Sequence, residues 1–216
     1  GIALGVAGRS APISGLEHAV SHLLDMAATV GGRPVGRHGA QVGVAAAVAA
    51  AWWARTLGSF DPERIVERGA TLDHDRVRRS IEAAFGALDP SGAMAAECWR
   101  EVARKLARWR EAEARRRDVA VAWEAHRTRL AQLVCAPDRI VAALRAAGAP
   151  ARFSELDPPV PPETVRWAFR SACLLRERFG VADLDWLAGG GSERDGALDA
   201  AVEAALDAAG SAGGGL

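Results

Sequence analysis

The stretch PISGLEHAVSHLLDMAATVGGRPVGRHGAQVGV, residues 12–44, decides how the chain around it folds. His18 and His22 lie four residues apart where the apolar residues have helical spacing, so both imidazoles are predicted on one face of a helix. A loop of glycine, proline and arginine ends that segment, and His38 opens a second predicted helix over residues 39–57. The stretch therefore predicts two helices that meet at a corner lined by three histidines.

The start of the first helix carries a local signal of its own. Ser14 is the predicted N-cap, and Glu17 follows three residues later, which is the spacing of a capping box. Glu17 also directly precedes His18, so its carboxylate has two open roles: capping the helix or supporting the neighbouring imidazole. Of these two roles, the sequence favours capping.

Three neutral imidazoles gathered at such a corner form a candidate site for a divalent metal ion. Asp25 lies on the same predicted helix face as His18 and His22 and is a candidate carboxylate ligand. The alternative is that the histidines are structural, because two histidines four residues apart on a helix often occur without a metal. Spacing alone does not decide between these two interpretations.

The histidine motif of residues 14–44 resembles that of a known enzyme family. Ser-Gly-x-Glu-His-x-x-x-His at residues 14–22, followed by His-Gly-x-x-Val-Gly-Val at 38–44, resembles the metal-binding half of the sn-glycerol-1-phosphate dehydrogenases. These enzymes belong to the iron-containing alcohol dehydrogenase and dehydroquinate synthase superfamily. Residues 167–187, WAFRSACLLRERFGVADLDWL, are similar to the closing helix of that family and its Arg-x-Arg-(Phe/Tyr) ending. Ala40 departs from the pattern, since many relatives carry glutamate there.

The resemblance implies a fold and a set of site residues. The expected fold is all-α, a multi-helix bundle that forms the C-terminal half of a dehydroquinate synthase-like or iron-containing alcohol dehydrogenase fold. His18 and His38 are implied to be ligands of a catalytic Zn²⁺, or of Ni²⁺ or Fe²⁺ as in some relatives. His22 is implied to be the catalytic and substrate-binding histidine. The third ligand of the family is an aspartate from a preceding helix, which we expect to lie outside this chain.

The implied activity is the NAD(P)-dependent reduction of dihydroxyacetone phosphate to sn-glycerol 1-phosphate by a cytoplasmic enzyme, with a homodimer as the expected assembly. In the resembled family an N-terminal domain binds most of the NAD(P). No strand followed by a glycine-rich turn and a helix appears in this sequence, and residues 1–8 are predicted to be the end of a helix already under way. We therefore expect a fragment that is inactive alone.

Two other functions remain open at this point. A dehydroquinate synthase-like cyclase, which is a lyase, also places histidines before and at a His-Gly motif. The residues before His18 and the alanine-rich stretch after His38 favour the dehydrogenase. The second alternative is a helical module without enzymatic activity, in which the histidines are structural.

Composition excludes several classes of partner. Lys and Arg number 27, as do Asp and Glu, so no net charge attracts nucleic acid or an anionic membrane. The basic run 104–117 is interleaved with glutamates and is interpreted as a solvated helix face. The most apolar run, residues 42–54, is too short and too rich in alanine for a membrane span. Three cysteines without a Cys-x-x-Cys pair indicate buried thiols in a reducing cytosol, and these are Cys98, Cys135 and Cys173.

The rest of the chain has helical periodicity and almost no strand signal. Helices are predicted over residues 72–88, over 93–133 with a break at 115–118, over 139–147 and over 163–178. Glycine and alanine dominate from residue 189 onward. We therefore predict one helical domain over residues 1–188 and a flexible tail over 189–216.

Overall fold

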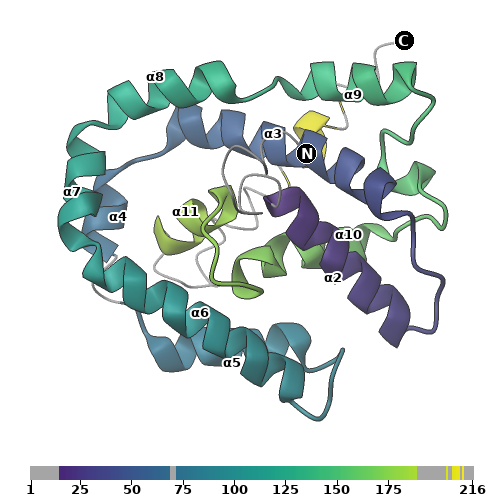
Figure 1. The fold of residues 1–216 in the computed structure, drawn as a ribbon, viewed down its shortest axis with the longest axis horizontal. Helices are drawn as coiled ribbons and strands as arrows, with labels where there is room; N and C mark the ends of the chain where they lie inside the picture. The colour runs from purple at the N-terminus through teal and green to yellow at the C-terminus, as the bar shows by residue number, and fades with distance from the viewer. Residues whose placement is uncertain (1–14, 69–71, 189–202, 204–205, 210, 212–216) are drawn as a thin grey trace, which may run out of the picture.

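The computed structural model describes residues 15–68, 72–188, 203, 206–209 and 211, which are helical or in loops and include no β-strand. The predicted all-α class is therefore confirmed for this part of the chain. Its principal elements, shown in Figure 1, are α2 (Leu16–Val30), α3 (His38–Ser59), α4 (Glu63–Arg68), α5 (His74–Phe85), α6 (Ala93–Glu111), α7 (Glu113–Val121), α8 (Trp123–Leu133), α9 (Pro137–Ala146), α10 (Pro162–Ser171), the 3₁₀ turn η3 (Ala172–Leu174) and α11 (Val181–Ala188).

Helix α3 is the central element of the bundle. It contacts α2, α8, α9 and α11, and its alanines at 45, 47 and 49–51 are all buried. Small side chains on several faces of one helix allow several neighbours to approach it closely, which is why a helix so rich in alanine lies inside the fold. Trp52 is fully buried near its end, and its Nε1 donates a hydrogen bond of 2.5 Å to Asp185 Oδ2 of α11.

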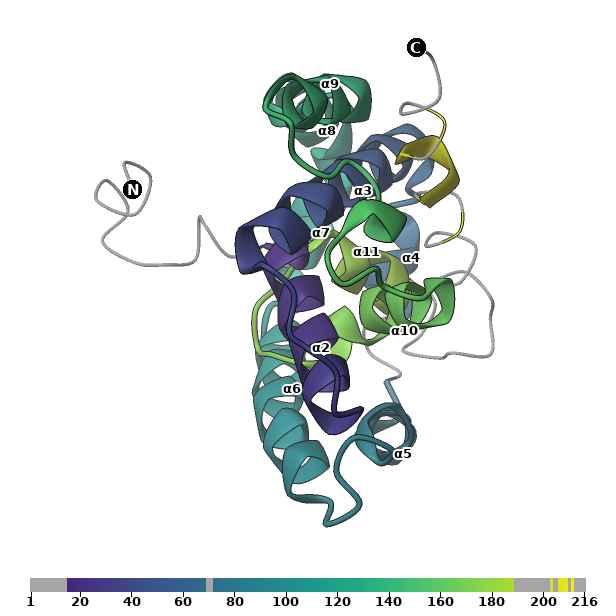
Figure 2. The same ribbon diagram turned by 90° about the vertical axis from the view of Figure 1, so that its right-hand side faces the viewer.

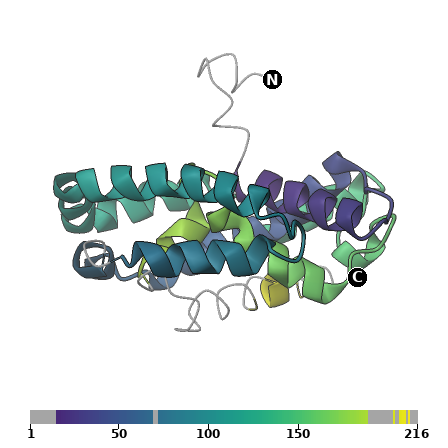
Figure 3. The ribbon, with the colours of Figure 1, turned by 90° about the horizontal axis from the view of Figure 1, so that it is seen from below.

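Helix α2 packs on α3 and α10. Its buried apolar residues include Val20, Leu23 and Leu24, which are the residues that the helical spacing predicts to face the core. Seen from below, α2 and α6 lie along one face, α5 and α10 lie along the other, and α11 lies between them (Figure 3). In the view of Figure 2, α8 and α9 form one edge and α5 the opposite edge.

The predicted break at residues 115–118 is wrong, because these residues lie inside α7 and the chain turns at Ala112 and Ala122 instead. The interpretation of residues 104–117 as a solvated face is also wrong at two positions. Arg116 is buried, donates to the carbonyl oxygen of Trp109 and lies 4.9 Å over its ring. Lys105 is 1 % exposed. Both side chains hold α6 against its neighbours, which a charge pattern alone does not indicate.

The predicted helix 163–178 is too long. The α-helix ends at Ser171, a 3₁₀ turn continues to Leu174, and residues 175–180 are not helical. Contacts with α6 stabilise the loop that replaces the end of the predicted helix: the Cys173 carbonyl oxygen accepts a hydrogen bond from Lys105 Nζ, and the Glu177 carbonyl oxygen accepts one from Arg108 Nη2. Local helical periodicity does not predict such tertiary contacts.

Two parts of the predicted domain organisation lie largely outside the described residues. Residues 1–14, with the predicted end of an earlier helix, are one of them. Of the predicted tail 189–216, only residues 203, 206–209 and 211 are described; Glu203 Oε1 lies 2.7 Å from Arg166 Nε, and Ala209 is buried. Among the described helices, none has both the length and the apolarity needed to cross a membrane.

Candidate metal centre

The three histidines of the motif come together where α2 meets the start of α3. His38 is the first residue of α3, and its ring centroid lies 5.3 Å from that of His18 and 5.5 Å from that of His22. The loop of residues 31–37 returns the chain so that the start of α3 lies beside the middle of α2. The corner that spacing predicts is therefore present, with all three imidazoles in it.

Glu17 fixes the tautomer of His18. The carboxylate atom Oε1 lies 3.0 Å from His18 Nδ1, and a carboxylate can only accept, so Nδ1 carries the hydrogen in the neutral ring. The same oxygen accepts a 3.0 Å hydrogen bond from the backbone N–H of Gly15, which is the N-cap residue of α2. Glu17 thus performs both of the roles that the sequence leaves open, whereas Ser14 lies outside the described residues.

Ser21 and Gln41 fix the tautomer of His38 in the same way. The Ser21 hydroxyl donates to Gln41 Oε1 at 2.6 Å and lies 2.8 Å from His38 Nδ1. A hydroxyl has one hydrogen, so Ser21 Oγ accepts from His38 Nδ1–H. Ser21 and Gln41 are both buried, at 0 % and 2 % exposure. Sequence reasoning missed Ser21, because only the register of α2 against α3 brings it to His38.

The two ligand candidates therefore have the same hydrogen-bonding state. His18 and His38 each use Nδ1 as a donor, and no described residue bonds to the Nε2 of either ring. This is the usual state of a metal-binding histidine, whose second nitrogen is held by a carboxylate or another acceptor. Two imidazoles on one tetrahedral zinc ion, with Zn–N near 2.1 Å, have ring centroids roughly 5 Å apart. The 5.3 Å separation of His18 and His38 fits that arrangement.

A third ligand is not found among the described residues. They contain no group of three His, Cys, Asp or Glu side chains placed to hold a metal ion. Asp25, the carboxylate on the same helix, is therefore not brought into one group with His18 and His38. Its Oδ1 is nevertheless buried without a hydrogen-bond partner in the part of the chain that the structure describes.

His22 lies beside His38, one of the two ligand candidates, and the positive charge of Arg176 acts on its ring. Burial lowers the pKa of His22 from its ordinary value, and the charge of Arg176 lowers it further; Asp25 opposes the shift. The imidazole is therefore mainly neutral at pH 7, and it can donate one hydrogen bond and accept another.

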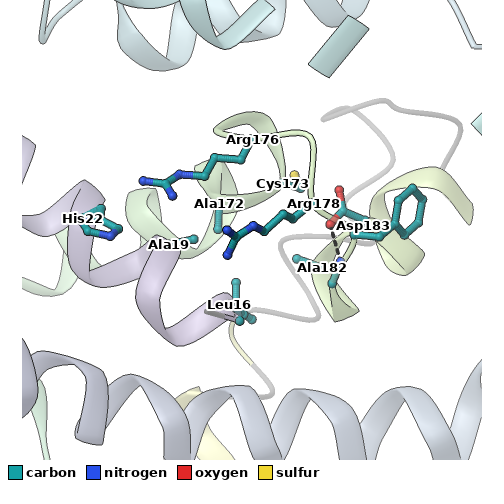
Figure 4. Close-up of a pocket in the computed structure, with 12 residues that line it drawn as sticks. Leu16, Ala19, His22, Ala172, Cys173, Arg176, Arg178, Ala182 and Asp183 are labelled. Atoms are coloured by element: carbon teal, nitrogen blue, oxygen red, sulfur yellow. Dashed lines mark hydrogen bonds between the residues drawn. The ribbon is translucent and has the colours of Figure 1, made fainter. Parts of the chain in front are cut away.

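His22 also lines a pocket between α2 and the loop that follows η3, with Arg176 and Arg178 on the opposite wall (Figure 4). Sequence reasoning did not single out these two arginines as site residues. They were predicted to lie on a helix that the structure ends earlier. The remaining signal in the sequence was the Arg-x-Arg-Phe pattern at 176–179.

Comparisons with protein-family models, with curated proteins and with solved structures give no match for this chain.

Proposed function

We propose that this chain is the metal-binding helical domain of an NAD(P)-dependent dehydrogenase that reduces dihydroxyacetone phosphate, or a closely related phosphorylated ketone, to sn-glycerol 1-phosphate. The observation that carries the proposal is the matched state of two histidines. His18 and His38 both have Nδ1 engaged by an acceptor and Nε2 without a bond to any described residue. This shared state leaves both Nε2 atoms available as ligands of one metal ion.

The donor set supports a divalent metal ion held by His18 and His38. Neutral imidazoles with a carboxylate suit Zn²⁺, Ni²⁺ and Fe²⁺. The resemblance supplies the carboxylate from an aspartate of a preceding helix, which is consistent with only two ligands being present here. Such an ion, when bound, polarises the oxygen of a ketone or alcohol as a Lewis acid.

The residues of this chain set the protonation of the ligand histidines and contact the substrate. Glu17 and Ser21 keep the Nε2 atoms of His18 and His38 unprotonated, so that both nitrogens remain available as ligands. His22, neutral at pH 7, is the proposed substrate contact beside them. The NAD(P) cofactor carries the hydride and is bound mainly by a nucleotide-binding domain that the resemblance places before these helices. We therefore propose that the chain is inactive without that domain.

The proposed location is the cytoplasm. Cys98, Cys135 and Cys173 are all free thiols, which supports a reducing compartment. The proposed fold is the C-terminal half of the dehydroquinate synthase-like architecture. The all-helical bundle of the described residues supports this proposal at the level of fold class.

The first test follows Zn²⁺ binding to the chain by NMR of its five histidine rings. We expect the Nε2 signals of His18 and His38 to move together, and His18→Ala and His38→Ala each to abolish the response. His126→Ala, on the exposed surface of α8, is the matched control and leaves the response unchanged. A zinc response that survives both substitutions, or that spreads equally over all histidines, overturns the metal centre and leaves the non-enzymatic helical module.

The second test measures activity with the chain joined to the nucleotide-binding domain of the resembled architecture. We expect oxidation of NADH that requires both dihydroxyacetone phosphate and metal, and that is lost in His18→Ala. Metal binding at His18 and His38 without any consumption of NADH overturns the dehydrogenase. The cyclase alternative predicts that outcome, because its turnover consumes no NADH.

A further inference from the structure

A second cavity, with a volume of about 290 Å³, lies between α3, α10 and the segment that precedes α10. The described part of the C-terminal segment forms its remaining wall. Most of the lining is apolar, and its aliphatic side chains include Val44, Val48, Val160, Val165 and Leu206. The cavity shares no lining residue with the pocket between α2 and the loop after η3, so it is a separate feature of the bundle.

The size and the walls of this cavity favour an apolar occupant. Val44 is 2 % exposed, and Val48 and Val165 are each 3 % exposed, so these side chains are withdrawn from bulk water. Apolar walls offer water few hydrogen-bond partners, and an apolar cavity of about 150 Å³ is known to hold benzene. A cavity twice as large therefore admits an apolar molecule of roughly ten to twelve heavy atoms.

A single polar corner interrupts the apolar lining. Arg152 and Ser154 line the cavity at the 3₁₀ turn η2 (Phe153–Glu155), and both residues are exposed to solvent. They therefore mark the side on which the cavity meets water. Within the part of the chain that the structure describes, the Arg152 side chain makes no hydrogen bond or ion pair.

The neighbouring carboxylates are engaged by other arginines. Two arginines, Arg152 and Arg166, line the cavity, and no acidic residue is among its lining residues. Glu203 Oε1 lies 2.7 Å from Arg166 Nε, and Glu155 Oε1 lies 3.9 Å from Arg145 Nη2. One guanidinium at the edge of an apolar cavity thus has no carboxylate partner among the described residues, which favours a ligand with one negative charge.

We propose that this cavity binds an unbranched medium-chain carboxylate, with its alkyl chain between α3 and α10 and its carboxylate on Arg152. A guanidinium presents two parallel N–H donors that match the two oxygens of a carboxylate. The Ser154 hydroxyl is a further donor at the same corner. Octanoate and decanoate match the volume, because their heavy atoms number about ten to twelve. The inference does not rest on the proposed function.

The experiment titrates the chain with butanoate, hexanoate, octanoate and decanoate by calorimetry, at concentrations below micelle formation. We expect affinity to rise about three- to fourfold with each added methylene, as expected for burial of a CH₂ group, and binding to show a negative heat-capacity change. Methyl NMR locates the ligand, and we expect octanoate to shift the signals of Val44, Val48 and Leu206.

Arg152→Ala tests the carboxylate contact. Because Arg152 is exposed, its replacement leaves the packing of the bundle intact. We expect octanoate to bind about five- to tenfold more weakly, since hydrogen bonds to a charged group at an exposed position are partly screened. Octanol, which has no charge, should bind this variant and the unaltered chain equally. Arg139→Ala, which removes an exposed arginine of α9, is the matched control and leaves octanoate binding unchanged.

Val160→Trp tests the cavity itself, because a larger side chain at this half-buried lining position occupies the space of the alkyl chain. We expect it to abolish binding of both octanoate and octanol, with circular dichroism confirming that the helices are intact. Octanoate binding that is absent, or that both Arg152→Ala and Val160→Trp leave as it was, overturns the inference. Octanol binding to the unaltered chain as tightly as octanoate overturns the assignment of a carboxylate.

Discussion

The hydroxyl of Ser21 on α2 accepts a 2.8 Å hydrogen bond from Nδ1 of His38 on α3, although 17 positions separate the two residues. The same hydroxyl donates to Gln41 one turn further along α3. One buried serine thus joins the two helices and sets the protonation of an imidazole at their corner. Helix packing and ligand orientation depend on the same hydrogen bonds.

Ser21→Ala tests this double role. Removal of the hydroxyl leaves His38 Nδ1 and Gln41 Oε1 without their partner, so we expect the free energy of unfolding to fall by about 1–3 kcal/mol. We expect zinc affinity to fall by about 10–100-fold, as for other residues that orient a metal ligand. Urea unfolding and zinc titration measure the two effects. Thr29→Ala removes an exposed hydroxyl of the same helix and should change neither the free energy of unfolding nor the zinc affinity. If Thr29→Ala lowered both as much as Ser21→Ala, the role assigned to Ser21 would be contradicted.

Glu17→Ala is expected to remove the preference of His18 for one tautomer. In the unaltered chain the ¹⁵N shifts of the ring should report hydrogen on Nδ1, because the carboxylate lies 3.0 Å from that atom. Without Glu17 we expect a mixture of tautomers, together with a loss of about 1 kcal/mol of stability, because the Gly15 N–H also loses its acceptor. Hydrogen on Nε2 of His18 in the unaltered chain would show that the assignment is wrong.

His22 is expected to titrate below its ordinary pKa of 6.5. Burial is the larger cause and Arg176 the second, so Arg176→Ala should raise the pKa of His22 without restoring it fully. Because the folded chain binds this proton less tightly than the unfolded chain, His22 lowers stability as the pH falls through 6.5 toward the folded pKa. Ring proton NMR against pH provides the measurement, with Arg139→Ala as control. A midpoint at or above 6.5 contradicts the assigned environment.

The pair of Lys105 and Asp183 is expected to behave as a buried ion pair. Lys105 is 1 % and Asp183 4 % exposed, and their Nζ and Oδ1 atoms lie 2.6 Å apart. Lys105→Met should cost about 3–5 kcal/mol, because one buried charge loses its partner, whereas Lys105→Met with Asp183→Leu should cost much less than the sum of the two single changes. Urea unfolding of the two single variants and the double variant completes this double-mutant cycle. If the losses in free energy of unfolding simply added, the pairing would be contradicted.

The three cysteines are expected to differ sharply in reactivity. Burial raises the pKa of Cys98 to about 11, and Cys173 is also buried. The predicted burial is wrong for Cys135, which is exposed. Because the thiolate is the reactive form, iodoacetamide at pH 8 should modify one thiol of the folded chain rapidly and all three after unfolding. Mass spectrometry counts the adducts. Cys135→Ser should abolish the rapid reaction, and rapid labelling of Cys98 in the folded chain would show that α6 is not packed as described.

The histidine corner was predictable because its determinants are local. The spacing of His18 and His22, the loop of residues 31–37 and the position of His38 are all contained in one stretch. Ser21 was not recognised, because the sequence does not give the register of α2 on α3. Its partner Gln41 is reached only when the two helices pack.

The arginine pocket was not predictable for a different reason. Helical periodicity continues through residue 178, and nothing local ends it. In the structure the segment that follows the helix is held by tertiary contacts, including the hydrogen bond from Lys105 to the carbonyl of Cys173, 68 positions away. Lys105 belongs to a basic run that the sequence predicts to be solvated. Sequence patterns describe the average environment of a basic run, whereas burial of one of its members depends on tertiary packing.

Lys105 has a consequence for how this molecule could be redesigned. Its ammonium group binds the carbonyl of Cys173 and the carboxylate of Asp183, so it ties together the two ends of the loop that carries Arg176 and Arg178. Residues inside the loop also contact α6, since Glu177 bonds to Arg104 and Arg108 and Phe179 stacks on Trp109. A redesign of the loop would therefore keep Lys105, Glu177 and Phe179 and vary only positions between these contacts, so that the bundle beneath stays unchanged.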